Sequence, residues 1–466
     1  PNDFSAENYN TFDLHRPFVD EIVLVSNSGE HMHRETDLID VWFDSGSMPY
    51  AQVHYPFENK EDIDEGKAFP ADYIAEGVDQ TRGWFYTLHA IATMCFDSVA
   101  YKNVISNGLV LDKEGLKMSK RLGNAADPFE ILKQYGPDAT RWYMITNAQP
   151  WDNLKFDRVG IEEARRKFFG TLYNSYAFFA LYANIDCFTN QEEQIPIHKR
   201  PEIDRWILSR LNSLIQDVES FYEDYEPTRA GRAIQNFVDN HLSNWYVRLC
   251  RRRFWKGDYS EDKVAAYQTL YYCLASVAQL AAPIAPFFMD KLYIDLSASN
   301  DDVAQSSVHL SDFPEINKDV IDKELESRMQ IAQDVSSMVL SLRKKEGIKV
   351  RQPLSKIMIP VINESFRKQL EAVEGLILSE LNIKQLEYID GSSDIFVKTI
   401  KPNFKVLGPK YGKHMKEIAQ KLIELKKEDI ETLETENTYE LTIGGERVVI
   451  DLEDVEISSG DVPGWL

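Results

Sequence analysis

Residues 103–135 contain the feature that most restricts how this chain folds: an apolar run, a loop rich in cations, and the start of a helix. The run at residues 104–111 is apolar and β-branched, which predicts a buried strand. A polar turn is predicted at residues 112–115. Asp127 and Pro128 suit the N-cap and the first position of a helix. The stretch is therefore predicted to be α/β structure, with a loop between a buried strand and a helix.

The loop within this stretch carries three cations, Lys117, Lys120 and Arg121, and the flanking Gly115 and Gly123 are candidate hinges. Such a loop can close over a polyphosphate, where lysine ammonium groups neutralise the charge that develops on a leaving pyrophosphate. The loop offers no nucleophile, so its contribution would be positioning and electrostatic stabilisation. A lysine-rich surface turn is the alternative interpretation, and only the surrounding sequence decides between the two.

A second candidate site follows a short predicted strand at residues 72–75. Residues 80–95 are predicted to be a helix with Asp79 as its N-cap. Glu76 and Gly77 then fall at the carboxyl end of the strand, where open α/β sheets bind nucleotides. A carboxylate suits ribose hydroxyls, a glycine lets a ligand approach the backbone, and a helix N-terminus favours negative charge. Taken singly, Asp79 is more simply a helix cap.

Residues 40–46 are predicted to form a strand that ends in a tight turn. The run contains Trp42, and a second tryptophan, Trp84, lies in the predicted helix that follows Asp79. Each tryptophan taken alone is interpreted as a core aromatic side chain.

The composition limits the class of protein. A chain of 466 residues is too long for one core and is predicted to form three or four domains. The formal net charge of −23 counts against a generic nucleic-acid binder, although an acidic protein can bind RNA where its cations are grouped. The four cysteines form no Cys-x-x-Cys pair, which favours a reducing, cytoplasmic environment and argues against a zinc site. The sequence shows no membrane span and no signal peptide, and its start at Pro1 suggests a fragment or a processed piece.

The middle of the chain shows helical periodicity, which predicts a helical bundle. Cations collect on two of the predicted helices, and aromatic side chains interleave with the second group, a mixture suited to phosphates and unstacked bases. A solvated charged face is the alternative interpretation. The predicted helices cover residues 161–183, 204–222, 227–253 and 262–280, and the candidate RNA-binding residues are Trp245, Arg248, Arg251, Arg252 and Arg253.

From residue 319 the composition changes to a mixed α/β pattern with many acidic residues. A helix is predicted at residues 322–345 and strands at residues 357–361 and 381–388. The basic segment 401–413 is interpreted equally well as an RNA contact and as a solvated loop. Residues 431–466 are predicted to be two acidic strands and a tail.

Several of these segments resemble the isoleucyl-tRNA synthetase family, a class I aminoacyl-tRNA synthetase family, in its eukaryote-like type. The resemblance covers essentially the whole chain and is carried by five motifs. They are Trp42-Phe43-Asp44-Ser45-Gly46, Glu76-Gly77-x-Asp79-Gln80 with Arg82-Gly83-Trp84-Phe85, Lys117-Met118-Ser119-Lys120 with Gly123-Asn124, the run PDATRWYM at residues 137–144, and Ser243-Asn244-Trp245-Tyr246-Val247-Arg248.

The resemblance implies attack of the isoleucine carboxylate on the α-phosphate of ATP, and then transfer of isoleucine to the terminal ribose of its tRNA. Mg²⁺ would enter with ATP rather than through a protein cage. Lys117 and Lys120 are implied to act in catalysis by holding the triphosphate in the transition state, and Trp42 and Trp84 to wall the isoleucine side chain. ATP and the adenylate are implied to contact Lys117, Met118, Ser119, Lys120, Glu76, Gly77, Asp79 and Gln80.

The implied architecture is a multidomain α/β plus all-α chain: the second half of a Rossmann-like catalytic domain, a helical anticodon-binding domain and a small α/β domain. The expected boundaries are 1–136, 137–185 for a region that contacts the tRNA stem, 186–315 and 316–466. The partners are expected to be tRNA-Ile, isoleucine and ATP, with no membrane, and the chain is expected to be a cytoplasmic monomer.

The other class I signature, His-Ile-Gly-His, is absent, since no His-x-Gly-His occurs at any of the nine histidines. We therefore expect the chain alone not to activate isoleucine. The alternatives are an autonomous tRNA-binding module and a valyl or leucyl relative of the same class.

Overall fold

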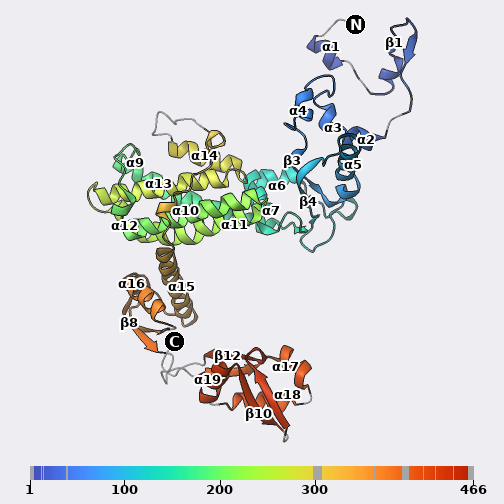
Figure 1. Ribbon diagram of the computed structural model, residues 1–466. Coiled ribbons are helices and arrows are strands. Elements are labelled where there is room, and N and C mark those ends of the chain that lie inside the picture. Colours follow the sequence, from blue (N-terminus) through green and yellow to red (C-terminus); the bar gives the residue numbers. More distant parts are fainter. Residues whose placement is uncertain are drawn as a thin grey trace. The chain divides into compact units, whose positions relative to one another are not determined.

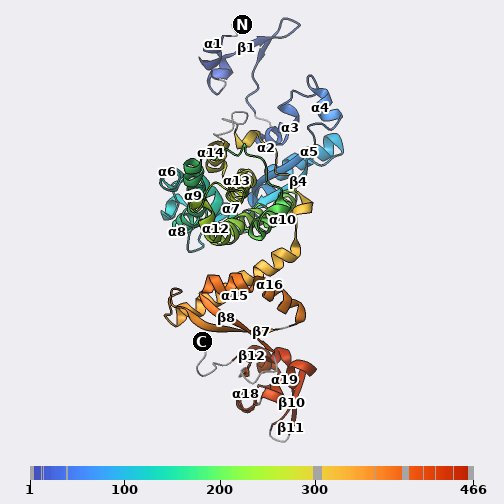
Figure 2. The same cartoon turned by 90° about the vertical axis from the view of Figure 1, so that its left-hand side faces the viewer.

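The computed structural model describes residues 5–459, except 12, 14, 38–39, 298–306, 362, 391–397, 413, 426 and 444–445. Its contacts divide the chain into two compact units, Pro1–Lys318 and Asp319–Leu466 (Figures 1 and 2). Among the described residues, no helix is long and apolar enough to cross a membrane.

The first unit contains a small parallel α/β element. Strand β3 (Ala71–Gly77) pairs in parallel with β4 (Tyr101–Asn107), and α5 (Trp84–Phe96) connects them. Leu88, Ile91 and Ala92 of α5 are buried against Tyr50 and Phe69, which explains why this apolar sequence forms a helix that covers the sheet. The strand predicted before the nucleotide-binding residues is therefore confirmed, two residues longer at its carboxyl end.

Short elements precede and follow this sheet in the chain. Before it come α1 (Ala6–Thr11), the antiparallel hairpin of β1 (Val23–Val25) and β2 (His31–His33), α2 (Val41–Gly46), α3 (Met48–Ala51) and α4 (Lys60–Asp64). After it, β5 (Val110–Leu111) pairs in parallel with β6 (Leu154–Lys155), and α6 (Pro128–Tyr135) lies between them in the chain.

Three sequence-based expectations are wrong in this region. Residues 40–46 form the helix α2 rather than a strand, because the side chain of Asp40 accepts a hydrogen bond from the backbone N–H of Trp42 and caps the first turn. Asp79 does not cap α5, since it lies within a 3₁₀ turn, Val78–Arg82, that precedes the helix. The run 104–111 is not a single buried strand, because it spans two strands and the side chain of Val104 is 48% exposed.

The rest of the first unit is a helical bundle, as the periodicity predicted (Figure 1). Large side chains fill its centre, among them Trp142, Trp206 and Tyr267, each at most 1% exposed. Two segments of π-helix, Arg165–Phe169 and Phe237–Val247, interrupt otherwise continuous helices. The α-helices are α7 (Pro137–Asn147), α8 (Arg158–Ala164), α9 (Gly170–Asp186), α10 (Glu202–Glu223), α11 (Pro227–Asn236), α12 (Arg248–Trp255), α13 (Glu261–Ala281) and α14 (Pro286–Ser297). Helices α7 and α14 were not anticipated from the sequence.

Helix α7 joins the α/β element to the bundle through its carboxyl end. The side chain of Thr228 on α11 donates a hydrogen bond to the carbonyl of Ile145 (2.7 Å), and Arg232 donates to the carbonyls of Thr146 (2.7 Å) and Asn147 (3.1 Å). These side chains from a neighbouring helix satisfy carbonyl groups that the end of α7 leaves without helical partners.

The second unit begins with α15 (Lys323–Lys345), capped by Asp322, and α16 (Glu364–Leu381), which pack together. Strands β7 (Leu354–Val361) and β8 (Ile383–Asp390) pair in parallel, so both predicted strands and the predicted helix are confirmed. A second core follows, in which β9 (Lys398–Pro402) pairs with β12 (Val455–Ser459) and β10 (Thr438–Ile443) with β11 (Glu446–Asp451), under α17 (Phe404–Tyr411), α18 (Met415–Ile423) and α19 (Lys427–Glu436).

The end of the chain differs from its prediction. Residues 431–436 complete the helix α19, and three strands follow where two were expected, while residues 460–466 of the predicted tail lie outside the described residues. Leu441, Val448 and Val455 are buried in this second core, so each of the three strands contributes apolar side chains to it.

Candidate nucleotide site and nucleic-acid interface

Glu76 and Gly77 are the last two residues of β3 and lie at the carboxyl edge of the parallel pair. The side chains of Glu76 and Asp79 are exposed, so both carboxylates are accessible to a ligand. A Cβ atom at Gly77 would lie 2.7 Å from the Oδ1 atom of Asp79, which explains why this position has no side chain. The edge therefore offers two carboxylates, and that of Asp79 lies against the backbone of Gly77.

Gln80 has a structural role that the sequence did not reveal. Its Oε1 atom accepts a hydrogen bond from the backbone N–H of Trp84 (2.9 Å), at the first turn of α5. Gln80 therefore caps the helix that had been expected to take Asp79 as its cap.

The two candidate tryptophans come together between α2 and α5. The Nε1 atom of Trp84 donates a hydrogen bond to the carbonyl of Ser45 on α2 (2.9 Å). A Cβ atom at Gly83 would lie 3.0 Å from the Cη2 atom of Trp42, so the Trp42 ring rests on the backbone of Gly83. The Trp42 side chain is 45% exposed, which leaves an aromatic surface next to the start of α5.

The cationic loop is organised by Asp112 and Asn124. The Oδ1 atom of Asp112 accepts from the N–H of Leu116 (2.8 Å), and its Oδ2 atom accepts from the Nδ2 atom of Asn124 (2.8 Å). Asn124 also binds the backbone of Ser119 through its Oδ1 atom (2.9 Å) and the carbonyl of Lys117 (3.3 Å). The hydrogen bond from Asn124 and those from the backbone lower the pKa of Asp112, so this clamp carries a negative charge at neutral pH.

Both ends of the loop contain glycines in the left-handed region, Gly115 at φ +89° and Gly123 at φ +67°. Lys117 is exposed and forms no ion pair with any described residue, so its ammonium group is available to an anion. The backbone of Lys120 begins a short 3₁₀ turn, and its side chain lies outside the described residues. Within the described part of the chain, no hydrogen bond or ion pair joins this loop to residues 76–84.

The basic helix α12 divides its arginines between solvent and core. Arg248, Arg251 and Arg252 are exposed, as is Trp255, which was not among the residues expected to bind RNA. The Trp245 side chain is 7% exposed, so stacking on a base would require its displacement from the bundle. The exposed set on this helix is therefore three arginines and one tryptophan.

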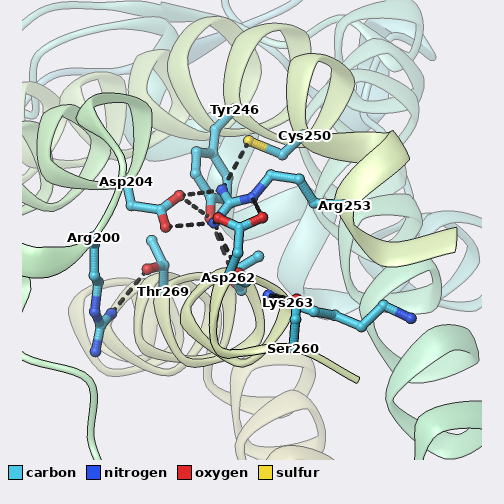
Figure 3. Close-up of polar contacts among 10 residues, drawn as sticks. Arg200, Asp204, Tyr246, Cys250, Arg253, Ser260, Asp262, Lys263 and Thr269 are labelled. Carbon is cyan, nitrogen blue, oxygen red and sulfur yellow. Dashed lines mark hydrogen bonds and ion pairs between the residues drawn. The ribbon is translucent and has the colours of Figure 1, made fainter. Parts of the chain in front are cut away.

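Arg253 was also expected to bind RNA, and in the structure its guanidinium is engaged within the fold. Its guanidinium donates two parallel hydrogen bonds to the carboxylate of Asp204, at 2.6 and 2.9 Å, and two more to the carboxylate of Asp262, at 3.0 and 2.9 Å (Figure 3). The Arg253 side chain is 16% exposed and that of Asp204 is fully buried. Both carboxylates lie in the first turns of α10 and α13, where the helix dipole favours negative charge. Arg253 therefore links three helices.

Tyr246 completes this buried network. Its hydroxyl donates a hydrogen bond to the Oδ1 atom of Asp204 (2.9 Å), and burial raises its pKa well above the ordinary range. Burial alone would lower the pKa of Arg253, but its hydrogen bonds with Asp204 outweigh that effect and raise it. The network is therefore a charged structural element of the bundle.

The described residues contain no group of three or more His, Cys, Asp or Glu side chains that could hold a metal ion. The four cysteines are free thiols; Cys95 and Cys187 are exposed, and Cys250 and Cys273 are buried.

Comparisons with known proteins agree with this arrangement. Residues 2–157 match the family of tRNA synthetases class I (I, L, M and V), and residues 204–359 match the anticodon-binding domain of tRNA ligase. Over its full length the chain is 62% identical to the isoleucine–tRNA ligase of Bacteroides fragilis, of which it covers 41%. It is 42% identical over 442 residues to the isoleucine–tRNA ligase of Thermus thermophilus, which is 95% of this chain and 41% of that protein.

Among solved structures, the ternary complex of Agrobacterium radiobacter K84 agnB2 LeuRS, tRNA and LeuAMS is similar at a TM-score of 0.49 and 20% identity, over 64% of this chain and 36% of that one. The chain spans about two fifths of the length of the curated relatives it matches. With a catalytic segment followed by an anticodon-binding segment, and with high identity along its whole length, the chain belongs to the family of class I tRNA synthetases.

Proposed function

We propose that this chain supplies part of an isoleucine–tRNA ligase, which uses ATP with Mg²⁺ to form isoleucyl-adenylate and then transfers isoleucine to tRNA-Ile. The observation that carries the proposal is the clamped loop: Asp112 and Asn124 fix its two ends, while Lys117 remains exposed and unpaired among the described residues. An ordered loop that presents an uncommitted ammonium group suits the stabilisation of a transferring polyphosphate. The identity to isoleucine–tRNA ligases supports the choice of amino acid.

Activation requires a carboxylate oxygen of isoleucine to bond to the α-phosphorus while the bond to pyrophosphate breaks. Lys117 and Lys120 would hold the triphosphate and offset the charge on the leaving group, with Met118 and Ser119 ordering the loop between them. In the second step a ribose hydroxyl attacks the isoleucyl carbonyl and AMP leaves. Mg²⁺ would supply charge neutralisation as part of the ATP complex.

The strand edge would bind the ribose of the adenylate, and the tryptophan pair would contact its isoleucine side chain. Glu76 and Asp79 would accept hydrogen bonds from ribose hydroxyls, Gly77 would permit close approach of the ligand, and Gln80 would act by fixing the start of α5. Trp42 and Trp84 would wall the aliphatic side chain, because an apolar ligand needs an apolar surface of matching shape. Such a pocket discriminates against one missing methylene by about 1–3 kcal/mol.

The exposed face of α12 would bind tRNA through Arg248, Arg251 and Arg252, with Trp255 available for stacking. In this scheme residues 1–136 complete a catalytic domain, 137–185 contact the tRNA stem, 186–315 bind the anticodon region and 316–466 form a small α/β domain. The free cysteines support a reducing, cytoplasmic setting. The ligase would act as a monomer.

The test is complementation. The chain alone is expected to show no isoleucine-dependent pyrophosphate exchange, because it lacks the His-Ile-Gly-His motif, and the remaining portion of a relative is expected to restore the exchange when added. In the restored enzyme, Lys120→Ala is expected to abolish the exchange. Exchange that depends on valine or leucine would favour a valyl or leucyl enzyme, and tRNA binding without any restorable exchange would favour an autonomous tRNA-binding module.

A further inference from the structure

A cluster of exposed cations lies outside the proposed nucleotide site and outside α12, at the carboxyl end of α15 and in the turn that connects α15 to β7. Residues 344–351 contain four cations and one acid, Glu346, in a chain with a formal net charge of −23. Lys384, the second residue of the neighbouring strand β8, adds a fifth cation beside this turn. All five side chains are exposed: Lys344, Lys345, Lys349, Arg351 and Lys384. We call these five residues the basic turn.

The basic turn does not use its charge within the fold. None of its five side chains forms an ion pair in the described part of the chain, although other lysines of the same unit do. Lys356 binds Glu387 at 2.6 Å, and Lys410 binds Asp451 at 2.9 Å and Asp454 at 2.8 Å. Exposed cations without carboxylate partners concentrate positive potential at one place on an otherwise acidic protein.

The turn is held by hydrogen bonds to its backbone, which leaves its side chains free to act. Arg343 is 1% exposed, and its Nη2 atom donates to the carbonyls of Gln352 (2.8 Å) and Leu381 (2.9 Å). The Nδ2 atom of Asn382 donates to the carbonyls of Val350 (3.0 Å) and Arg351 (3.2 Å). Since these carbonyls are bound from within the fold, the turn has one defined conformation.

Arg343 also contributes charge. No carboxylate pairs with it among the described residues, and its Nε and Nη1 atoms have no hydrogen-bond partner there. Its partners are neutral carbonyls, one of them at the carboxyl end of α16. A buried cation that is solvated by carbonyls but not neutralised by a carboxylate adds to the positive potential at the basic turn.

We propose that the basic turn binds the phosphate backbone of the RNA substrate, as a second RNA surface in addition to α12. The proposal rests on the proposed function, which makes an RNA the polyanionic partner of this chain. Lysine and arginine side chains on a fixed backbone suit phosphates, which position a nucleic acid without reading its sequence. The basic turn is therefore expected to contribute affinity and salt dependence rather than discrimination between tRNAs.

The test is binding of an isoleucine tRNA transcript to the chain between about 50 and 200 mM salt, for wild type and for the combined variant Lys344→Gln, Lys345→Gln, Lys349→Gln and Arg351→Gln. Each lost phosphate contact reduces the slope of log K against log salt by roughly 0.7–0.9. We expect the slope of the variant to fall by about 2–4 and its affinity at the lowest salt to fall about tenfold or more. The ratio of affinities for matched and mismatched tRNA is expected to stay unchanged.

A matched control removes the same charge elsewhere. Lys60, Lys67, Lys102 and Lys291 are exposed, and each forms an ion pair with a carboxylate. The combined Lys→Gln variant at these four positions should retain the wild-type slope. A basic-turn variant that keeps the wild-type slope and affinity, while its circular dichroism is unchanged, would overturn the proposal, and so would an equal loss in the control.

Two further outcomes separate this proposal from others. If wild type binds no RNA at any salt concentration, the basic-turn proposal fails, and the complementation test alone then decides the proposed function. If wild type and the basic-turn variant bind RNA equally, and the variant binds vesicles containing phosphatidylserine less tightly than wild type, the function stands and the turn instead serves a membrane surface.

Discussion

The buried ion pair between Asp204 and Arg253 allows a sharp test of how the bundle is held together. Arg253→Met keeps most of the side-chain volume and removes the guanidinium. Among the described residues, Asp204, with no exposed surface, then keeps the hydroxyl of Tyr246 as its side-chain hydrogen-bond partner and the electrostatic attraction of the buried Arg200. Asp204→Ala removes the buried carboxylate but leaves Arg253 bound to Asp262, which is 52% exposed.

The expected magnitudes differ between the two variants. Breaking a buried pair by removing one partner costs about 3–5 kcal/mol, because the other charge stays buried without compensation. The loss of unfolding free energy for Arg253→Met is expected near the upper end of that range, because this variant leaves the fully buried Asp204 carboxylate without its guanidinium partner. Asp204→Ala is expected near the lower end, because Arg253 is 16% exposed and retains a partner. The double variant Asp204→Leu with Arg253→Met is expected to recover most of the loss, since apolar replacement of a whole buried pair is often neutral.

Urea unfolding of the intact chain, followed by tryptophan fluorescence, is the assay. Seven of the eight tryptophans lie before residue 319, so the fluorescence reports on the first unit. A loss below about 1 kcal/mol for Arg253→Met would refute the reasoning, because it would mean that the buried carboxylate is not destabilised by losing its partner. A double variant that is no more stable than Arg253→Met would refute it equally, because removing the orphaned carboxylate should relieve the cost of burying it.

Three other predictions follow from the site and its surroundings. Burial raises the pKa of Asp239 to about 6, so ionisation of this carboxyl opposes folding. The unfolding free energy should therefore fall between pH 4 and pH 6 by up to ~3 kcal/mol. Asp239→Asn should abolish that fall, measured by urea unfolding at both ends of the range. Arg251→Gln and Arg252→Gln should weaken tRNA binding with little change in the unfolding free energy, which is the opposite pattern from Arg253→Met. Equal losses of stability in all three variants would contradict the division of α12 into two faces. Gly83→Ala places a methyl group 2.8 Å from the Oε1 atom of Gln80 and 3.0 Å from Trp42, so it disturbs both the start of α5 and the tryptophan pair. In the complemented enzyme it should raise KM for isoleucine in pyrophosphate exchange more than it lowers kcat, and an unchanged KM would argue against the tryptophan pocket.

The sequence predicted the cationic loop well because local turn chemistry determines it. Asp127 caps α6 with Pro128 at the first helical position, and Gly115 has a positive φ angle, as such residues favour. The same local rules did not reveal that Asp112 and Asn124 meet, since twelve residues separate them. The polar turn and the Gly123-Asn124 motif marked both positions, but only the fold brings their side chains into contact.

The wrong predictions concern features that tertiary packing determines, and a short stretch of sequence does not encode that packing. Residues 40–46 look extended because of their aromatic and β-branched content, yet close packing of Gly46 against Ile91 and Thr87 seats this segment on α5 as a helix. On α12 the buried Cys250 and Phe254 define the inner face, and Arg253, adjacent to Phe254, turns toward it. Neighbouring arginines in sequence therefore have different roles, and the burial of Asp204 in another helix decides between them.

The hydrogen bonds from Thr228 and Arg232 to the end of α7 affect how this protein can be divided for experiments. A recombinant fragment that starts after residue 185 would keep both donors but lose the carbonyls of Ile145 and Thr146, and one that ends at residue 185 would keep those carbonyls without their donors. Each hydrogen bond lost in this way contributes about 0.5–1.5 kcal/mol. The boundary between the proposed stem-contact and anticodon-binding regions is thus a poor place for truncation, and recombinant fragments should carry residues 137–318 as one piece.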